Sequence, residues 1–153
     1  MLADLRSALA KAVTKDVSVT EASLAAAIAN KELVVHFQPK IDLQTSDLRI
    51  AGAEALVRWN RPGIGLVFPD AFIPLAEASG LIGPLTDLVL DGTVRQLHAW
   101  RELGLDLTIA VNLSRHLLGD TALPDRINRL LAEIGVPNSR LNLEITETGV
   151  MAD

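Results

Sequence analysis

Three oxygen-bearing side chains lie in segments that otherwise look like buried strands. Glu54 interrupts the apolar run at 48–59, and Asn112 and Glu144 stand in similar runs further along the chain. A buried carboxylate is costly unless it is paired, hydrogen-bonded or bound to a metal. If a metal is involved, two carboxylates and one amide favour a hard divalent cation over zinc. Such a cation can polarise a phosphoryl oxygen and acidify a bound water. We therefore expect the three side chains to share one site.

The elements that must position these residues follow from periodicity and from turn residues. Apolar residues at helical spacing predict helices, and short β-branched runs bounded by Gly, Pro, Asn or Asp predict strands. We expect a Ser18-x-x-Glu21 capping box before the second helix and the end of the first strand at Gln38-Pro39, because proline cannot donate to a sheet. The predicted helices are Leu2–Lys15, 21–31, Asp70–Ser79, Pro84–Leu103 and Pro124–Ile134, and the predicted strands are Leu33–Phe37, Leu48–Trp59, Leu107–Leu113 and Leu141–Thr146.

From Leu48 onward the predicted order is strand, helices, strand, helix, strand. This alternation indicates parallel strands joined by helical crossovers. Asn112 and Glu144 are separated by about one strand–helix–strand repeat, which takes ~30 residues or more. Polar residues near the carboxyl ends of successive parallel strands meet at one mouth of a sheet or barrel, where active sites form.

The composition of the chain argues against several other classes of function. Hydrophobic residues make up 49% of the 153, but no apolar run reaches the ~18 residues of a membrane span. Met1–Asp16 lacks the pattern of a secretory signal. A net charge of −5 argues against DNA or RNA binding. The sequence has no cysteine, which excludes disulfides and thiolate metal sites and agrees with a cytoplasmic location.

Five blocks in this order resemble the EAL domain, a family of bacterial cyclic di-GMP phosphodiesterases. The resemblance covers the chain from about Leu33 to its C-terminus. A lone Glu-Ala-Leu triplet would carry no weight, whereas five blocks at family-like spacing are specific. The blocks are Phe37-Gln38-Pro39-Lys40, 52–59, Pro69-x-x-Phe72-Ile73-Pro74-x-Ala76-Glu77, Val111-Asn112-Leu113-Ser114 and Leu143-Glu144-Ile145-Thr146-Glu147.

The resemblance implies a TIM-barrel-like (β/α)8 fold that hydrolyses cyclic di-GMP to linear pGpG with Mg²⁺ or Mn²⁺, Ca²⁺ being an inhibitory substitute. A complete barrel takes ~250 residues, so we expect about the first half of it, with 1–31 as an N-terminal helical extension or linker and 32–153 as a partial EAL domain. Position by position, the resemblance makes Glu54, Asn112 and Glu144 metal ligands. It also predicts that Gln38, Leu56 and Arg58 contact the dinucleotide, and that Arg58 contacts its phosphate.

Each role has a structural alternative. Glu54 and Arg58 could form an ion pair with each other, since they are near neighbours on one predicted strand. Asn112 could satisfy backbone groups of a loop, and Gln38 could make an ordinary strand-end hydrogen bond. Ser114 reads as a helix cap, because no base is evident beside it in the sequence.

The resemblance also implies that later strands of the family supply further acidic residues and a lysine. We therefore expect this polypeptide alone to be inactive, with cyclic di-GMP binding weak or absent and a metal site that need not be filled. The alternative is an inactive EAL-like regulatory module that binds cyclic di-GMP or a protein partner. An incomplete barrel exposes a sheet edge, so we expect self-association through Leu141–Ile145.

Overall fold

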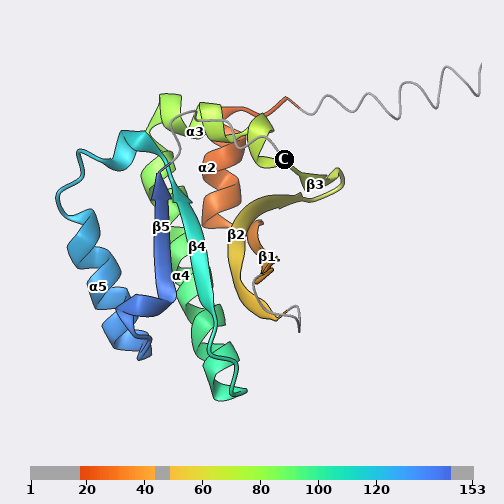
Figure 1. Cartoon of the computed structure of the whole chain (residues 1–153). Helices are drawn as coiled ribbons and strands as arrows, with labels where there is room; N and C mark the ends of the chain where they lie inside the picture. Colours follow the sequence, from red (N-terminus) through yellow and green to blue (C-terminus); the bar gives the residue numbers. More distant parts are fainter. Residues whose placement is uncertain (1–17, 44–48, 146–153) are drawn as a thin grey trace, which may run out of the picture.

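The computed structural model of the chain describes residues 18–43 and 49–145 (Figure 1). The predicted helix Leu2–Lys15 lies outside the described residues. The helices are α2 (Glu21–Ala29), α3 (Ile73–Ser79), α4 (Ile82–Glu102) and α5 (Leu123–Ile134). The strands are β1 (Leu33–Ile41), β2 (Ile50–Arg61), β3 (Gly65–Val67), β4 (Thr108–Leu113) and β5 (Leu141–Ile145). Short 3-10 turns at Pro69–Ala71, Arg115–Leu117 and Asn138–Arg140 complete the set.

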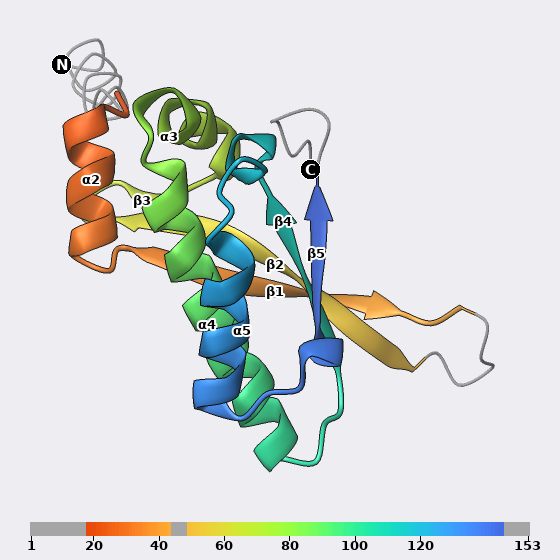
Figure 2. The same cartoon turned by 90° about the vertical axis from the view of Figure 1, so that its left-hand side faces the viewer.

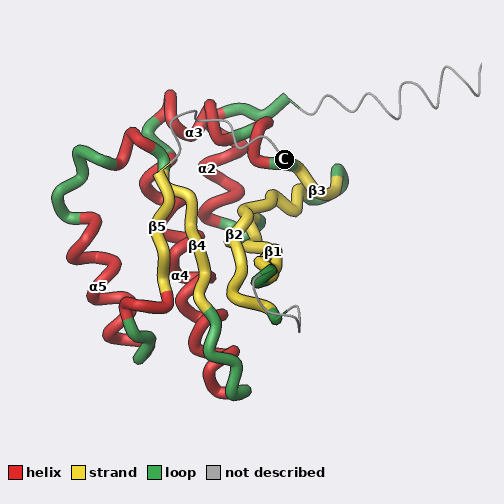
Figure 3. Tube along the Cα trace, in the orientation of Figure 1, coloured by secondary structure: helices red, strands yellow, loops and turns green. Residues whose placement is uncertain are grey.

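The strands form one sheet with the order β1-β2-β4-β5, and β3 extends it by pairing with β2 (Figure 3). β2, β4 and β5 are parallel, which confirms the strand–helix alternation expected from Leu48 onward. β1 pairs with β2 in the antiparallel sense. The part of the chain that the structure describes is thus a mixed α/β unit with a curved, partial sheet.

The expected end of β1 at Pro39 was wrong. The strand continues to Ile41, and Pro39 pairs with Ala53 in the register of β1 and β2. Within the described sheet β1 pairs only with β2, so it is an edge strand. An edge strand tolerates proline because one side of its backbone has no ladder to complete.

The helices cover one face of the sheet, and the core lies between the two layers (Figure 2). Alternate residues of a strand point to opposite faces, and on β2 the residues that join this core are Ala53, Ala55, Val57 and Trp59. Trp59 packs edge-on against Phe72, with ring centroids 6.1 Å apart. The intervening residues of β2 therefore belong to the opposite, open face.

Helix α2 begins with a capping box, but one residue pair differs from the prediction. Thr20 is the N-cap, and its side chain and that of Ser23 each accept a hydrogen bond from the other's backbone N–H. The Ser18–Glu21 pairing was wrong, because the helix begins two residues later than that pattern assumed. Leu24 and Ala27 are fully buried in the core. The division into an extension at 1–31 and a domain at 32–153 stays a prediction.

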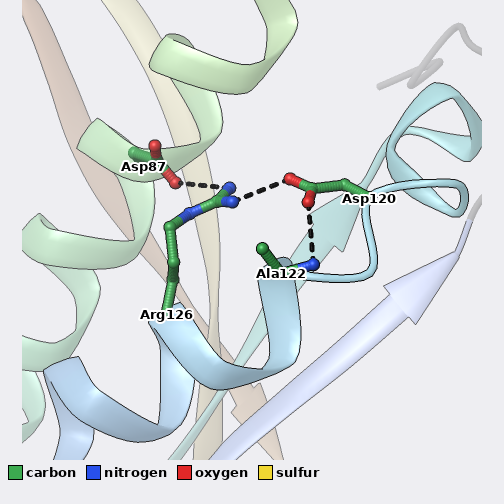
Figure 4. Close-up of polar contacts among 4 residues, drawn as sticks. All are labelled: Asp87, Asp120, Ala122 and Arg126. Carbon is green, nitrogen blue, oxygen red and sulfur yellow. Dashed lines mark hydrogen bonds and ion pairs between the residues drawn. The ribbon is translucent and has the colours of Figure 1, made fainter.

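Arg126 of α5 connects its own helix with α4 and with the segment that precedes α5 (Figure 4). Its Nη1 donates to Asp120 at 2.8 Å, and its Nη2 donates to Asp87 of α4 at 3.3 Å. Asp120 also accepts the backbone N–H of Ala122 at the start of α5. This pairing with Arg126 holds the pKa of Asp120 below its ordinary value.

In the described ranges, no helix is both long and apolar enough to cross a membrane.

Candidate functional site

The register of the sheet brings the predicted site residues to its open face. Cross-strand partners point to the same side of a sheet. Gln38 of β1 lies opposite Glu54 of β2, and Asn112 of β4 lies opposite Glu144 of β5. Glu54 in turn pairs with Ala110, two residues before Asn112 on the same face. The two-residue period of β2 then adds Leu56 and Arg58 to this face.

Asn112 and Glu54 are in direct contact. The side-chain Nδ2 of Asn112 donates to Oε1 of Glu54 at 2.7 Å, across neighbouring parallel strands. Both side chains are only partly exposed, and that of Glu54 is 28% exposed. The bond orients the Glu54 carboxylate toward the site, and it leaves the Asn112 side-chain oxygen uncommitted by this contact.

Lys40 links the two carboxylates. Its Nζ lies 3.1 Å from Oε1 of Glu144 and 4.0 Å from Oε2 of Glu54. The two carboxylates therefore converge on one point from strands β2 and β5, with β4 between them. They do not diverge to opposite faces of the sheet. Lys40 had no predicted role in the site, because its contact with Glu144 spans 104 residues of chain.

Arg58 lies further along β2 and is buried, with 7% exposure. Its Nη1 donates to the backbone oxygen of its neighbour Val57 at 2.9 Å, and its guanidinium lies 4.9 Å from the ring centroid of Phe68. Leu56, the residue between Glu54 and Arg58 on this face, is also buried. Along β2 the open face thus carries the Glu54 carboxylate, the apolar side chain of Leu56 and the Arg58 guanidinium in succession.

Ser114 caps the turn after β4, as expected, and it has a second role. Its side chain accepts the backbone N–H of His116 and donates to Oε1 of Glu77 on α3 at 2.6 Å. His116 Nδ1 lies 3.1 Å from the Ser114 oxygen and 3.5 Å from Glu77. The expectation that no base lies beside Ser114 was wrong, because His116 is two residues further along the chain and its ring contacts the Ser114 oxygen. Glu77 could not be found from the sequence, since only the packing of α3 on the end of β4 brings it here.

A small cavity of about 60 Å³ lies on the other, helix-covered side of β2 and β4. Its walls are mostly apolar side chains of the core, including Val57, Leu85 and Val89. Glu77, Asn112 and Ser114 also line it, so Asn112 borders both this cavity and the open face. Because it lies among residues of the packed layer, we do not assign it to the site on the open face.

The donor set on the open face fits a hard divalent cation. It offers two carboxylates and one amide, the oxygen ligands that Mg²⁺ and Mn²⁺ accept. The carboxylates already converge on a single positive charge, the ammonium of Lys40. Among the described residues there is no group of three or more His, Cys, Asp or Glu side chains placed to hold a metal. The side-chain oxygen of Asn112 is the third oxygen in the predicted set, beside the carboxylates of Glu54 and Glu144.

A partial α/β sheet with oxygen donors near the carboxyl ends of β4 and β5, and on β2 beside them, is typical of the class of barrel domains that carry their sites at the mouth. Comparison with protein families matches residues 21–153 to the EAL domain. The chain belongs to this family.

Characterised relatives and solved structures agree with this family. The chain is 38% identical over 128 residues to the cyclic di-GMP phosphodiesterase PdeR of Escherichia coli, covering 84% of the chain and 19% of PdeR. It is 39% identical over 128 residues to the bifunctional diguanylate cyclase/cyclic di-GMP phosphodiesterase MucR of Pseudomonas aeruginosa, covering 83% of the chain and 18% of MucR. The chain thus spans less than a quarter of these two relatives.

The solved structure of the PaMucR phosphodiesterase in complex with c-di-GMP matches with a TM-score of 0.77 and 38% identity. The match covers 86% of this chain and 53% of that one. The FimX EAL domain of Xanthomonas citri in complex with c-di-GMP matches with a TM-score of 0.71 and 27% identity, over 81% of this chain and 47% of that one. The fold is therefore the TIM-barrel-like EAL fold, of which this chain contains about the first half.

Proposed function

We propose that this chain supplies the first half of the catalytic site of a cyclic di-GMP phosphodiesterase. Glu54, Asn112 and Glu144 would hold Mg²⁺ or Mn²⁺, and Gln38, Leu56 and Arg58 would contact the dinucleotide. The observation that carries the proposal is the meeting of Glu54 with Asn112 and of both carboxylates around one point on the open face. The names of two similar proteins, PdeR and MucR, support the assignment of this reaction.

Each residue of the proposed site would have a separate role in the reaction. A bound Mg²⁺ or Mn²⁺ would supply Lewis acidity toward a phosphoryl oxygen and toward water. The Asn112 amide fixes the orientation of the Glu54 carboxylate. Arg58 is planar and permanently charged, which suits it to a phosphate oxygen. Its contact with Phe68 holds the guanidinium on the open face. Leu56 gives that face an apolar wall beside the charges.

Of the two outcomes expected from the sequence, weak binding of cyclic di-GMP or none, we propose that the 153-residue polypeptide on its own binds cyclic di-GMP weakly and without turnover. Two carboxylates and one amide can hold one cation, but the described part of the chain offers no further cluster of acidic side chains for a second. The same observation favours the second candidate function, a regulatory EAL module that binds cyclic di-GMP or a partner without hydrolysing it. The cytoplasmic location expected from the sequence stays a prediction.

The test is titration of cyclic di-GMP into the full chain by calorimetry in the presence of Ca²⁺, with a separate chromatographic assay for pGpG in Mn²⁺. We expect binding that Arg58→Met weakens by about tenfold or more, because a buried charged contact to phosphate is lost. Arg58→Lys keeps the charge and checks that the loss is not a folding defect. Arg95→Met on the exposed face of α4 is the control, since it removes the same charge elsewhere.

The outcomes separate the two parts of the proposal. Binding without pGpG supports both the site and the inactivity of this polypeptide. Release of pGpG would contradict the inactivity. Absence of binding, or equal binding by the Arg58→Met and Arg95→Met variants, would contradict the site on the open face.

A further inference from the structure

Lys40 reaches the site through two local features of β1 and β2. It lies opposite Gly52 in the register, so no side chain of β2 stands in its way. The register between β1 and β2 shifts after Lys40: Lys40 pairs with Gly52 and Ile41 with Ile50, so Ala51 is an extra residue on β2, an irregularity of the bulge type. Bulges bend a strand and re-aim the adjacent side chain. A glycine is also required at position 52 by the packing of β2 against β4, because a Cβ there would lie 2.5 Å from the Thr108 backbone oxygen.

The twist of the sheet also brings Lys40 of β1 toward Glu144 of β5. β1 and β2 run across the view in Figure 2 while β5 stands upright, so the strands turn strongly from one edge of the sheet to the other. Lys40 and Glu144 therefore meet although two strands separate β1 from β5. Their side chains remain accessible, at 44% exposure for Lys40 and 49% for Glu144. The ammonium can leave this position without unpacking the core.

We propose that Lys40 is an internal counter-ion that competes with the divalent cation for the carboxylates of Glu54 and Glu144. It is a positioning residue for the proposed metal site, and the inference rests on that site. Its ammonium holds the two carboxylates together when no metal is bound and must move away for the metal to enter. Lys40 thereby sets the threshold concentration of metal at which the site fills.

The physical basis is that both cations use the same oxygens. Two like-charged carboxylates that converge on one point repel each other unless a positive charge lies between them. The Lys40 ammonium lies within 4.0 Å of both and fulfils that need. Every divalent ion that binds there breaks these ion pairs first. Partly exposed pairs are individually weak, so the lysine raises the metal concentration required and does not block the site.

The experiment measures Mn²⁺ affinity by isothermal titration calorimetry and the melting temperature with and without Mn²⁺, using the full chain. We expect Lys40→Met to bind Mn²⁺ about 3- to 10-fold more tightly than wild type, because the competing ion pairs are gone. Without metal, Lys40→Met should melt at a lower temperature, and Mn²⁺ should raise its melting temperature more than that of wild type. Lys40→Arg keeps the charge and should stay close to wild type.

Lys31→Met is the matched control, since it removes the same charge from an exposed lysine just before β1, whereas Lys40 lies near the end of that strand. Tighter binding by Lys40→Met alone supports the inference. Equal or weaker Mn²⁺ binding by Lys40→Met, with wild type still binding, would overturn the role of Lys40 and leave the metal site standing. Failure of every variant to bind Mn²⁺ would overturn both.

Discussion

The amide nitrogen of Asn112 lies 2.7 Å from the Glu54 carboxylate, across adjacent parallel strands. The contact joins two of the three side chains that could hold a divalent cation. The contact argues against the alternative in which Asn112 only forms hydrogen bonds with the backbone of a loop, because its partner is a carboxylate on a neighbouring strand. Its energetic role is open to a direct test.

Asn112→Ala removes both the hydrogen bond to Glu54 and the third oxygen donor. We expect Mn²⁺ binding to weaken by about tenfold or more, the scale seen when ligand-orienting partners are lost. Asn142→Ala is the control, because Asn142 lies on the same face of the sheet, opposite Ala110. Its Mn²⁺ affinity, measured by calorimetry, should stay close to that of wild type. Equal losses in the two variants would count against a specific role for Asn112.

Gly52 tests whether β2 and β4 must approach as closely as the structure shows. A Cβ at this position would lie 2.5 Å from the Thr108 backbone oxygen and 2.7 Å from its hydroxyl. Gly52→Ala should therefore lower the free energy of unfolding by about 1–3 kcal/mol through overpacking. The measurement is denaturant unfolding followed by circular dichroism.

Gly83 provides the opposite expectation with the same substitution. It lies in helix α4, and a Cβ there would meet nothing within 4 Å. Gly83→Ala should raise the free energy of unfolding by about 0.4–1 kcal/mol, because it restricts the unfolded chain and favours the helix. Destabilisation by both substitutions to the same extent would mean that the contact of Gly52 with Thr108 is not the cause.

Asp120 gives the chain a specific response to acid. Its hydrogen bond with Arg126 lowers its pKa below the ordinary value of 3.8. The pairing therefore contributes stability above that value and loses it as the pH falls through the lower, folded-state pKa. Unfolding measured from pH 6 to pH 2 should show that wild type exceeds Asp120→Asn at the upper end and that the two converge at the acid end.

Asp125→Asn, in the first turn of α5, removes the same charge and is the control. At pH 6 its stability should lie closer to that of wild type than the stability of Asp120→Asn does, because the hydrogen bond between Asp120 and Arg126 stays in place. Parallel curves for wild type and Asp120→Asn over the whole range would contradict the role of the Asp120–Arg126 pair.

Strand β5 tests the predicted self-association. Among the described residues it pairs on one side only, with β4, and its Leu143 and Ile145 are 43% and 55% exposed. Exposed apolar edges recruit other chains, and an edge lysine opposes this. Light scattering at micromolar concentration should show oligomers for wild type and fewer for Leu143→Lys. Leu103→Lys, at an exposed residue just after α4, is the control. A stable wild-type monomer would refute the prediction.

The sequence predicted the parallel strands of the site and the meeting of Glu54, Asn112 and Glu144 at one place, because polar residues of successive parallel strands converge at one mouth. It did not predict which face of the sheet carries them, since the two-residue period assigns sides only once the core face is known. Glu54 and Arg58 share a face because of that period, and Asn112 and Glu144 pair because they end successive parallel strands. The family resemblance then connected this geometry with a chemistry.

Other features depend on long-range geometry that local patterns do not contain. The contact of Lys40 with Glu144 needs the twist of the whole sheet and the open position at Gly52. The hydrogen bond between Ser114 and Glu77 needs the packing of α3 on the end of β4. Pro39 was misread as a strand end because its place on an edge strand is a property of the sheet.

Mn²⁺ binding by Glu54→Gln and Glu144→Gln tests the central claim most directly. Each substitution keeps the side-chain shape and removes one of the two carboxylate charges that converge on the open face. If these residues share one cation, calorimetry should show a single Mn²⁺ site in the wild-type chain that weakens by about tenfold or more in both variants. Glu133→Gln, at an exposed residue of α5, should leave it unchanged. Undiminished binding in either Glu54→Gln or Glu144→Gln would contradict the account.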